Sequence, residues 1–186
     1  TLRRVMSDPS QVLLVGHPNV GKSVLFNRLA GASATESNYP GTTVDYAEGE
    51  LVIDGDTVPI IDTPGTFSLD PRDRAEELTV ELLKDAADAL VVGVIDATRF
   101  ERGLNLVLEL IERGYELVVA LNMWDQARRK GVDIDVDRVE WLLGVPVVPA
   151  VATEGRGVKT QHRRIDGANA KKESHLVHDV TNPPLY

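Results

Sequence analysis

The sequence of 186 residues contains no cysteine. Disulfide bonds, thiolate nucleophiles and zinc or iron–sulfur sites with cysteine ligands are therefore excluded. Basic residues are in the minority, since 20 Lys and Arg against 29 Asp and Glu give a formal net charge of −9. This balance disfavours a protein whose main task is to bind nucleic-acid phosphates, because such proteins usually carry a basic face. We expect no nucleic-acid partner.

Long apolar runs are also missing. No run reaches the roughly 20 residues that cross a bilayer, and residues 1–4 do not lead into the apolar core of a signal peptide. The residues that are present, 42% hydrophobic and 26% charged, are typical of a folded globular chain. We therefore expect a soluble, cytoplasmic segment of about one domain. This domain should cover residues 11–157, between an extension at 1–10 and a polar, aperiodic extension at 158–186.

Residues 11–150 alternate between short apolar runs and amphipathic stretches, which is typical of βαβ units. The pattern predicts an α/β fold with a mostly parallel sheet of six strands, one of them antiparallel in a hairpin around Asp54 and Gly55, and helices on both faces. Strands are expected at 12–15, 44–53, 57–61, 89–95, 116–121 and 145–148, and helices at 24–30, 104–111 and 136–143. The polar residues 32–42 are expected to form a loop. In the second helix, the residues expected to face the sheet are Leu104, Val107, Leu108 and Ile111.

Residues 16–23 fit the pattern G-x-x-x-x-G-K-[ST] between an expected strand and an expected helix. Glycines let the backbone wrap closely around a polyphosphate, whose charge meets amide N–H groups and a helix N-terminus. Lys22 would reach the β- and γ-phosphates, and the Ser23 hydroxyl would ligate Mg²⁺. An accidental glycine-rich turn is the alternative, which the flanking strand and helix disfavour. The residues expected to bind a nucleoside triphosphate here are His17, Pro18, Asn19, Val20, Gly21, Lys22, Ser23 and Val24.

A second set of residues is expected around the γ-phosphate. Asp62 ends an apolar strand, where a carboxylate can hold the Mg²⁺ shell through water; an ordinary turn residue is the alternative. The Gly65 N–H can then approach the γ-phosphate. Thr43, which closes the long polar loop, would offer its hydroxyl to Mg²⁺ and its N–H to the γ-phosphate. Residues 32–43 and 65–75 are therefore expected to order on triphosphate and relax after hydrolysis.

The order of the motifs favours guanine as the base. Asn122, Met123 and Asp125 belong to an Asn-x-x-Asp step that ends another apolar strand. The Asp125 carboxylate can accept hydrogen bonds from guanine N1–H and the exocyclic amine, a donor pair that adenine lacks. Asn122 would support the loop and the base edge. After the last expected strand, a backbone N–H of Val151, Ala152 or Thr153 can meet guanine O6.

Together these elements resemble the translation-factor-like GTPases with a Ras-like P-loop fold. The similarity is closer still to the cytoplasmic GTPase domain of the ferrous-iron transport B family (FeoB), and it covers roughly residues 11–157. Most GTPases carry lysine at the position of Met123, whereas this family looks like Asn-Met-x-Asp. The residues that carry the resemblance are 16–23, 25–27, 38–44, 62–69, 94–98, 101–102 and 121–125.

The resemblance implies a domain that binds GTP and GDP with Mg²⁺, hydrolyses GTP and regulates Fe²⁺ passage through a membrane-spanning part of the same transporter. Such a domain would lie at the cytoplasmic face of the inner membrane. The residues implied in hydrolysis are Lys22, Thr43, Gly65 and Asn19. In the family, the residue matching Asn19 holds a potassium ion together with carbonyls matching Ser37 and Tyr39, and this ion would offset charge on the transferring phosphoryl group. An Asx turn that stabilises the P-loop is an equal alternative for Asn19.

The same comparison indicates departures and alternatives. Thr66 stands where Ras-like enzymes carry a water-orienting glutamine, so slow intrinsic hydrolysis is expected. Val151 replaces a frequent serine, and residues beyond Gly157 do not resemble the closing helix or the helical region that follows in the family. A ribosome-assembly or tRNA-modification GTPase is one alternative, disfavoured by the net charge and Met123. A nucleotide sensor with little hydrolysis is another, and homo-oligomerisation stays open.

Two further clusters are better explained by structure than by metal binding. Histidines 162, 175 and 178 lie in the polar extension without an acidic or cysteine partner in register, so exposed side chains are favoured over a metal site. The acidic stretch 133–137 is expected to be the solvated start of a helix rather than an iron site.

Overall fold

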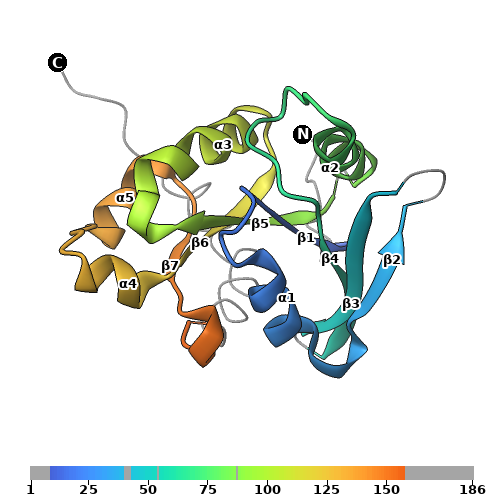
Figure 1. The fold of residues 1–186 in the computed structure, drawn as a ribbon, viewed down its shortest axis with the longest axis horizontal. Coiled ribbons are helices and arrows are strands. Elements are labelled where there is room, and N and C mark those ends of the chain that lie inside the picture. Colours follow the sequence, from blue (N-terminus) through green and yellow to red (C-terminus); the bar gives the residue numbers. More distant parts are fainter. Residues whose placement is uncertain (1–8, 40–42, 54, 87, 158–186) are drawn as a thin grey trace, which may run out of the picture.

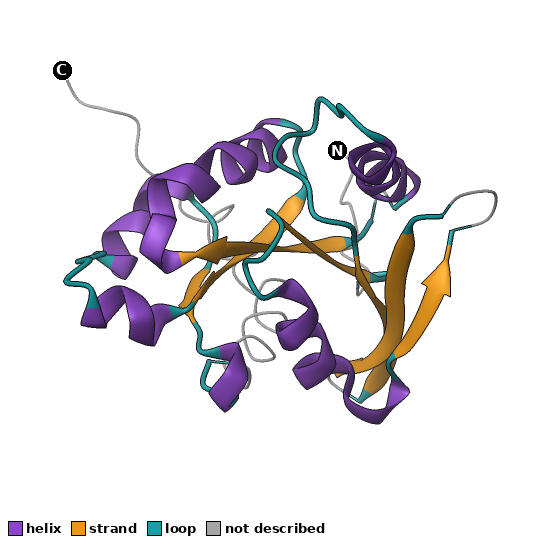
Figure 2. Cartoon of the chain, in the orientation of Figure 1, coloured by secondary structure: helices purple, strands orange, loops and turns teal. Residues whose placement is uncertain are grey.

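The computed structural model describes residues 9–157 except 40–42, 54 and 87. A seven-stranded sheet crosses the molecule in the order β2-β3-β4-β1-β5-β6-β7, with helices on both faces (Figures 1 and 2). The strands from β4 to β7 in this order are parallel, whereas β3 is antiparallel to both of its neighbours. The predicted α/β fold with a mostly parallel sheet is confirmed. The strands are β1 Val12–Gly16, β2 Thr35–Asn38, β3 Asp45–Ile53, β4 Asp56–Asp62, β5 Leu90–Asp96, β6 Glu116–Asn122 and β7 Val147–Pro149.

The sheet separates two apolar cores. Successive residues of β1 point to opposite faces, so Val12 and Leu14 belong to one core while Leu13 and Val15 belong to the other. The first core is covered by α1, and the second by α2 and α3 with contributions from α4 and α5. This double burial explains why the strands are nearly continuous apolar runs. The helices are α1 Lys22–Ala30, α2 Arg74–Asp85, α3 Phe100–Glu112, α4 Trp124–Arg129 and α5 Val136–Leu143.

The strand β2 corrects the expected count of six strands. Thr35–Asn38 lies within the stretch predicted to be a loop, but it pairs antiparallel with β3 at the edge of the sheet. Its four residues are exposed or half-buried, and they are Thr, Glu, Ser and Asn. A polar edge strand with no buried face lacks the apolar alternation by which strands are detected in a sequence.

The buried face of α3 also differs in one position from the prediction. Leu106, Val107 and Leu110 are buried, whereas Leu108 is 44% exposed. Leu104 and Ile111 pack against the core at its margin. Leu108 follows Val107 by one helical step, about 100° around the axis, and therefore lies beside the sheet-facing stripe.

The acidic stretch before α5 behaves as predicted, since the Asp135 side chain caps the helix by accepting from the Arg138 backbone N–H at 3.0 Å. The predicted tail histidines lie outside the described residues, as does Asp54 of the predicted hairpin turn. Within the part of the chain that the structure describes, no helix has the length and apolar character needed to cross a membrane.

Candidate nucleotide site

The loop between β1 and α1 forms a tight cradle at the carboxyl end of the central strand. Asn19 and Gly21 have left-handed backbone conformations, with φ of 63° and 86°. A Cβ atom at Gly21 would lie 2.3 Å from the Asn122 Nδ2 atom, so both the backbone angle and the space require glycine there. Gly21 caps α1, and its carbonyl accepts from the Leu25 N–H at 3.0 Å. The backbone N–H groups of residues 19–23 thus lie at the start of a helix, as expected of a phosphate cradle.

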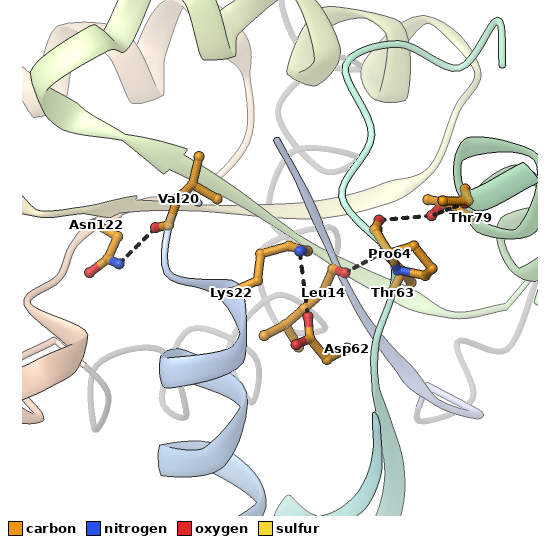
Figure 3. A network of polar contacts seen from close by, with 9 residues as sticks. Leu14, Val20, Lys22, Asp62, Thr63, Pro64, Thr79 and Asn122 are labelled. Atoms are coloured by element: carbon orange, nitrogen blue, oxygen red, sulfur yellow. Dashed lines mark hydrogen bonds and ion pairs between the residues drawn. The ribbon is translucent and has the colours of Figure 1, made fainter. Parts of the chain in front are cut away.

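Lys22 and Asp62 form a buried ion pair at the base of this cradle (Figure 3). The Lys22 Nζ and Asp62 Oδ1 atoms are 3.7 Å apart, and each side chain is 8% exposed. Burial lowers the pKa of Lys22, against the opposing effect of the Asp62 charge. Burial also raises the pKa of Asp62, against the effects of Lys22 and of a hydrogen bond from Ser23. A bound polyanion would therefore stabilise the charge on Lys22, and a bound cation would stabilise the charge on Asp62.

The oxygen atoms of Asp62 and Ser23 suit Mg²⁺, which prefers oxygen ligands. Asp62 Oδ1 is buried, and its ion-pair partner Lys22 lies beyond ordinary hydrogen-bond distance, so this oxygen has no close donor among the described residues. The Ser23 hydroxyl is close enough to hydrogen-bond to the same carboxylate. The described residues include no group of three or more His, Asp or Glu side chains that would hold a metal by themselves. Mg²⁺ sites of this kind combine a few protein oxygens, here those of Ser23 and Asp62, with phosphate oxygens and water.

The chain that follows Asp62 is bound along β1 and the cradle. The Thr63 hydroxyl donates to the Leu14 carbonyl at 2.8 Å, and the Thr66 N–H donates to the Gly16 carbonyl at 3.0 Å. A Cβ atom at Gly65 would lie within 2.9 Å of the Pro18 backbone, so the Gly65 peptide lies against the cradle. Thr66 is fully buried, and its hydroxyl donates to the Ser68 carbonyl at 2.7 Å. The Thr66 side chain therefore points into the protein.

Two carboxylates that the sequence did not single out hold residues 67–72. Glu76 of α2 is 5% exposed and accepts from the N–H groups of Phe67 at 3.0 Å and Arg72 at 2.9 Å. Glu109 of α3 accepts from the Ser68 hydroxyl at 3.1 Å and the Leu69 N–H at 2.6 Å. No sequence signal could have identified them, because a glutamate in a helix is ordinarily solvated.

Asn122 joins three loops at one point of the site. Its Nδ2 group donates to the Val20 carbonyl at 2.9 Å (Figure 3), and its Oδ1 accepts from the Ala152 N–H at 3.0 Å. The side chain is 4% exposed, so both of its polar ends are used inside the protein. The next residue, Met123, is left-handed with φ of 57°, and this conformation turns the chain into α4.

Asp125 lies in the first turn of α4, where its carboxylate is 20% exposed and paired with Arg129. The loop after β7 faces the same region. The Val151 N–H donates to the Arg156 carbonyl at 2.9 Å, and the Thr153 carbonyl accepts from Arg28 at 2.7 Å. Of the three amides considered for guanine O6, those of Val151 and Ala152 are therefore already donated within the protein.

His17 lies on the side of the cradle that faces α3. It is 9% exposed, its ring centroid is 4.9 Å from that of Phe67, and its Nε2 makes no hydrogen bond to any described residue. Burial and the nearby Arg102 lower the pKa of His17, although a hydrogen bond to the Phe67 backbone acts in the opposite direction. A cavity of about 210 Å³ opens beside it between the cradle, β5 and α3.

Three further predicted residues lie on β2 or between β2 and β3. Ser37 pairs with Tyr46 in the β2–β3 ladder, the Tyr39 N–H donates to the Val44 carbonyl at 3.1 Å, and Thr43 is exposed. Figure 1 shows the β2–β3 pair at the edge of the molecule, apart from the start of α1. The neighbouring residues 40–42 lie outside the described part of the chain.

Comparison with known proteins gives consistent matches. The family model described as ferrous iron transport protein B matches residues 10–165. A curated relative, the Fe(2+) transporter FeoB of Salmonella typhimurium, is 42% identical over 170 residues. Among solved structures, the GMPPNP form of the cytosolic domain of the T. maritima FeoB iron transporter is 35% identical with a TM-score of 0.79, and GDP form II is 32% identical with a TM-score of 0.79.

These matches cover the chain more fully than they cover the relatives. The Salmonella match includes 89% of this chain but 22% of the transporter, so the chain spans about a fifth of the length of its curated relative. The GMPPNP form covers 83% of this chain and 62% of the solved domain, and GDP form II covers 95% and 65%.

Proposed function

We propose that this chain, which belongs to the ferrous iron transport protein B family, binds guanine nucleotides and hydrolyses GTP as the switch domain of an Fe²⁺ transporter. The observation that carries the proposal is the buried Lys22–Asp62 pair at 3.7 Å beneath a glycine cradle. The pair places an ammonium group and a carboxylate oxygen without a close hydrogen-bond donor where a triphosphate and a divalent cation would meet. The nucleotide-bound forms of the T. maritima relative support the same assignment.

In this proposal the cradle binds the phosphates. The backbone N–H groups of residues 19–23 donate to phosphate oxygens, and the Lys22 ammonium neutralises charge on the β- and γ-phosphates. Lys22 is held ready by Asp62 and by burial, so little reorganisation is needed when the triphosphate enters. His17, Pro18 and Val24 border the cradle and shape its wall.

The proposed Mg²⁺ ligands are the hydroxyls of Ser23 and Thr43, with Asp62 acting through a water molecule. When bound, Mg²⁺ would neutralise charge between the β- and γ-phosphates. Thr43 is exposed just before β3, where its hydroxyl is accessible to an incoming ion. The Gly65 N–H, which already lies beside Pro18, is positioned to donate to the γ-phosphate.

The proposed reader of the base is Asp125, with Asn122 as its scaffold. Guanine presents two donors to one carboxylate, and adenine would leave that carboxylate unpaired. The Thr153 amide is the proposed donor to guanine O6, because the amides of Val151 and Ala152 are donated to Arg156 and Asn122. Met123 has the left-handed backbone conformation that directs the chain into α4, beside the proposed position of the base.

We propose slow intrinsic hydrolysis that is stimulated by potassium. Thr66 cannot orient a water molecule, because its hydroxyl is buried and donates to Ser68. Asn19 is exposed in the cradle, and its side chain makes no hydrogen bond to a described residue, so it lacks the contact that an Asx turn would provide. The Asn19 side-chain oxygen would hold K⁺ together with the carbonyls of Ser37 and Tyr39. The ion would supply the positive charge that an arginine finger supplies in other GTPases.

The proposal extends to the parts beyond this chain. We assign residues 11–157 as the GTPase domain, with extensions at 1–10 and 158–186. Its partner would be the membrane-spanning part of the same transporter, at the cytoplasmic face of the inner membrane. The transported Fe²⁺ would pass through that part and not through the residues described above.

The decisive test is nucleotide binding measured by calorimetry, followed by single-turnover hydrolysis in potassium and in sodium. We expect GDP and GTP to bind, ATP not to bind, and hydrolysis to be faster in potassium. Asp125→Asn should lose GDP and gain xanthosine diphosphate, because the amide can donate to the xanthine 2-oxo group. Binding without turnover in either salt would identify a nucleotide sensor, and a preference for ATP would overturn the proposal.

A further inference from the structure

We propose that Arg129 is a positioning residue for base recognition: it holds the Asp125 carboxylate in the orientation that meets both donors of guanine. The inference rests on the proposed function, because it concerns the same base-reading carboxylate. The two residues are one helical turn apart on α4 and form a hydrogen-bonded ion pair between Arg129 Nη2 and Asp125 Oδ2.

The helix that carries the pair is firmly anchored. Ala127 is fully buried against the second core, and the Trp124 N–H donates to the Ala150 carbonyl at 3.1 Å. The Ala127 N–H donates to the Met123 carbonyl at 3.0 Å, so the left-handed turn and the first helical turn form one unit. Residues four apart on such a helix lie on one face, which places the Arg129 guanidinium over the Asp125 side chain.

Asp125 needs such support, because the protein fixes it less completely than Asn122. Asn122 is buried and bonded at both ends, to Val20 and to Ala152. Asp125 is 20% exposed, and among the described residues Arg129 is the partner found for its carboxylate. Without this partner, the torsions of the Asp125 side chain would be free to turn the carboxylate out of the plane of the base.

The ion pair leaves the carboxylate able to bind guanine. A carboxylate has about four acceptor positions on its two oxygens. Arg129 uses one position on Oδ2, and guanine N1–H and the 2-amino group need one on each oxygen. Arg129 is 73% exposed, so its contact orders an existing carboxylate and does not block the base. Removing it should therefore weaken guanine binding rather than strengthen it.

The size of the effect follows from the exposure of the pair. Exposed ion pairs are worth little, so we expect GDP to bind about two- to fivefold more weakly to Arg129→Ala. Inosine diphosphate lacks the 2-amino group and needs one carboxylate oxygen only, so it should lose less affinity. The preference for GDP over inosine diphosphate should therefore fall in this variant.

The test is calorimetric binding of GDP and of inosine diphosphate to the full chain, to Arg129→Ala and to Arg128→Ala. Arg128 is the matched control, since it is exposed in the same turn of α4 and carries the same charge. We expect Arg128→Ala to keep both affinities, and the melting temperatures of the two variants to agree. A positioning role predicts that the GDP preference falls only in Arg129→Ala.

Three results would overturn the inference. If both nucleotides weaken equally in Arg129→Ala, the arginine acts by general attraction of phosphate. If GDP binds more tightly, the arginine competes with the base. If the two variants are indistinguishable, the pair has no role in recognition. Failure of the unaltered chain to bind GDP would instead refute the proposed function itself, so the two failures are distinguishable.

Discussion

Asn122 and His17 are both buried polar side chains at the site, but the protein satisfies them to different degrees. Asn122 uses its amide oxygen and its amide N–H group in hydrogen bonds to distant loops. His17 has a buried Nε2 atom without a hydrogen-bond partner among the described residues. Substitution of Asn122 should therefore lower the stability of the folded protein. Protonation of His17 should make that stability depend on pH.

We expect Asn122→Ala to destabilise the nucleotide-free protein by about 2 kcal/mol, because the Val20 carbonyl and the Ala152 N–H lose their partner inside the protein. Urea unfolding followed by circular dichroism measures the difference. Asn105→Ala is the control, since Asn105 is exposed on α3 and should change stability by less than about 0.5 kcal/mol. Equal effects of the two substitutions would contradict the structural role of Asn122.

The stability of the nucleotide-free protein should depend on the titration of His17. Its folded pKa lies below the ordinary 6.5, so protons bind the unfolded state more readily. The resulting stability is complete above pH 6.5 and is lost as the pH falls through the lowered pKa. His17→Gln cannot titrate, so the unfolding free energy of the parent protein should fall relative to this variant in acid. Parallel profiles between about pH 5 and about pH 8 would refute this prediction.

At the scale of elements, the segment after β4 is fixed by neighbours that come later in the chain. Glu76 from α2 and Glu109 from α3 together accept three backbone N–H groups and one hydroxyl of residues 67–72. The same residues follow the Gly65 peptide that lies against the cradle. These two helices therefore determine the conformation of a segment that is expected to respond to the γ-phosphate.

Glu109→Ala should loosen this segment while leaving the sheet intact. Leu69 loses its acceptor at 2.6 Å, so the exchange of its amide hydrogen should become faster, and trypsin should cut more readily at Arg72 and Arg74. Hydrogen exchange with mass spectrometry and limited proteolysis measure both effects. Glu112→Ala, an exposed change at the end of the same helix, serves as the control. Unchanged exchange at residues 67–72 would show that Glu109 does not hold them.

At the scale of the whole molecule, the proposed ligands come from elements that are distant in the chain. Lys22, Ser23 and Asp62 lie together at the carboxyl ends of β1 and β4. Thr43 is exposed and lies between β2 and β3 in the chain, and Ala47 of β3 pairs with Asp62. If Thr43 is a ligand, we expect the β2–β3 hairpin to approach the cradle when Mg²⁺ and a triphosphate bind.

Distance measurements can detect this movement, because a chain without cysteine accepts specific labels. Spin labels on Asn38→Cys at the end of β2 and Gln126→Cys on α4 attach at exposed positions. With Mg²⁺ and GMPPNP we expect a shorter mean distance by double electron–electron resonance than with GDP. A double-labelled protein with Asp125→Asn, which should not bind guanine, is the control. Identical distributions in all states would contradict an approach of the hairpin.

Much of the fold was predictable because it depends on patterns local in the chain. Strands buried on both faces give continuous apolar runs such as that of β1, and helices give apolar residues at intervals of three and four. Strand β2 escaped prediction because it buries no face, and Leu108 was assigned to the core because one helical step separates it from the buried stripe. Local pattern carries no information about pairing with a neighbour at the sheet edge.

The sequence by itself determined the α/β class and the position of the glycine-rich loop between β1 and α1, because apolar runs and motif spacing are local patterns. The residues that a nucleotide would meet there stay predictions. Only the tertiary structure decided how those residues are held. The hydrogen bonds of Asn122 to Val20 and Ala152, and those of Glu109 to Ser68 and Leu69, join groups far apart in the chain. Their relative positions follow from packing across the sheet, which no local pattern of residues encodes.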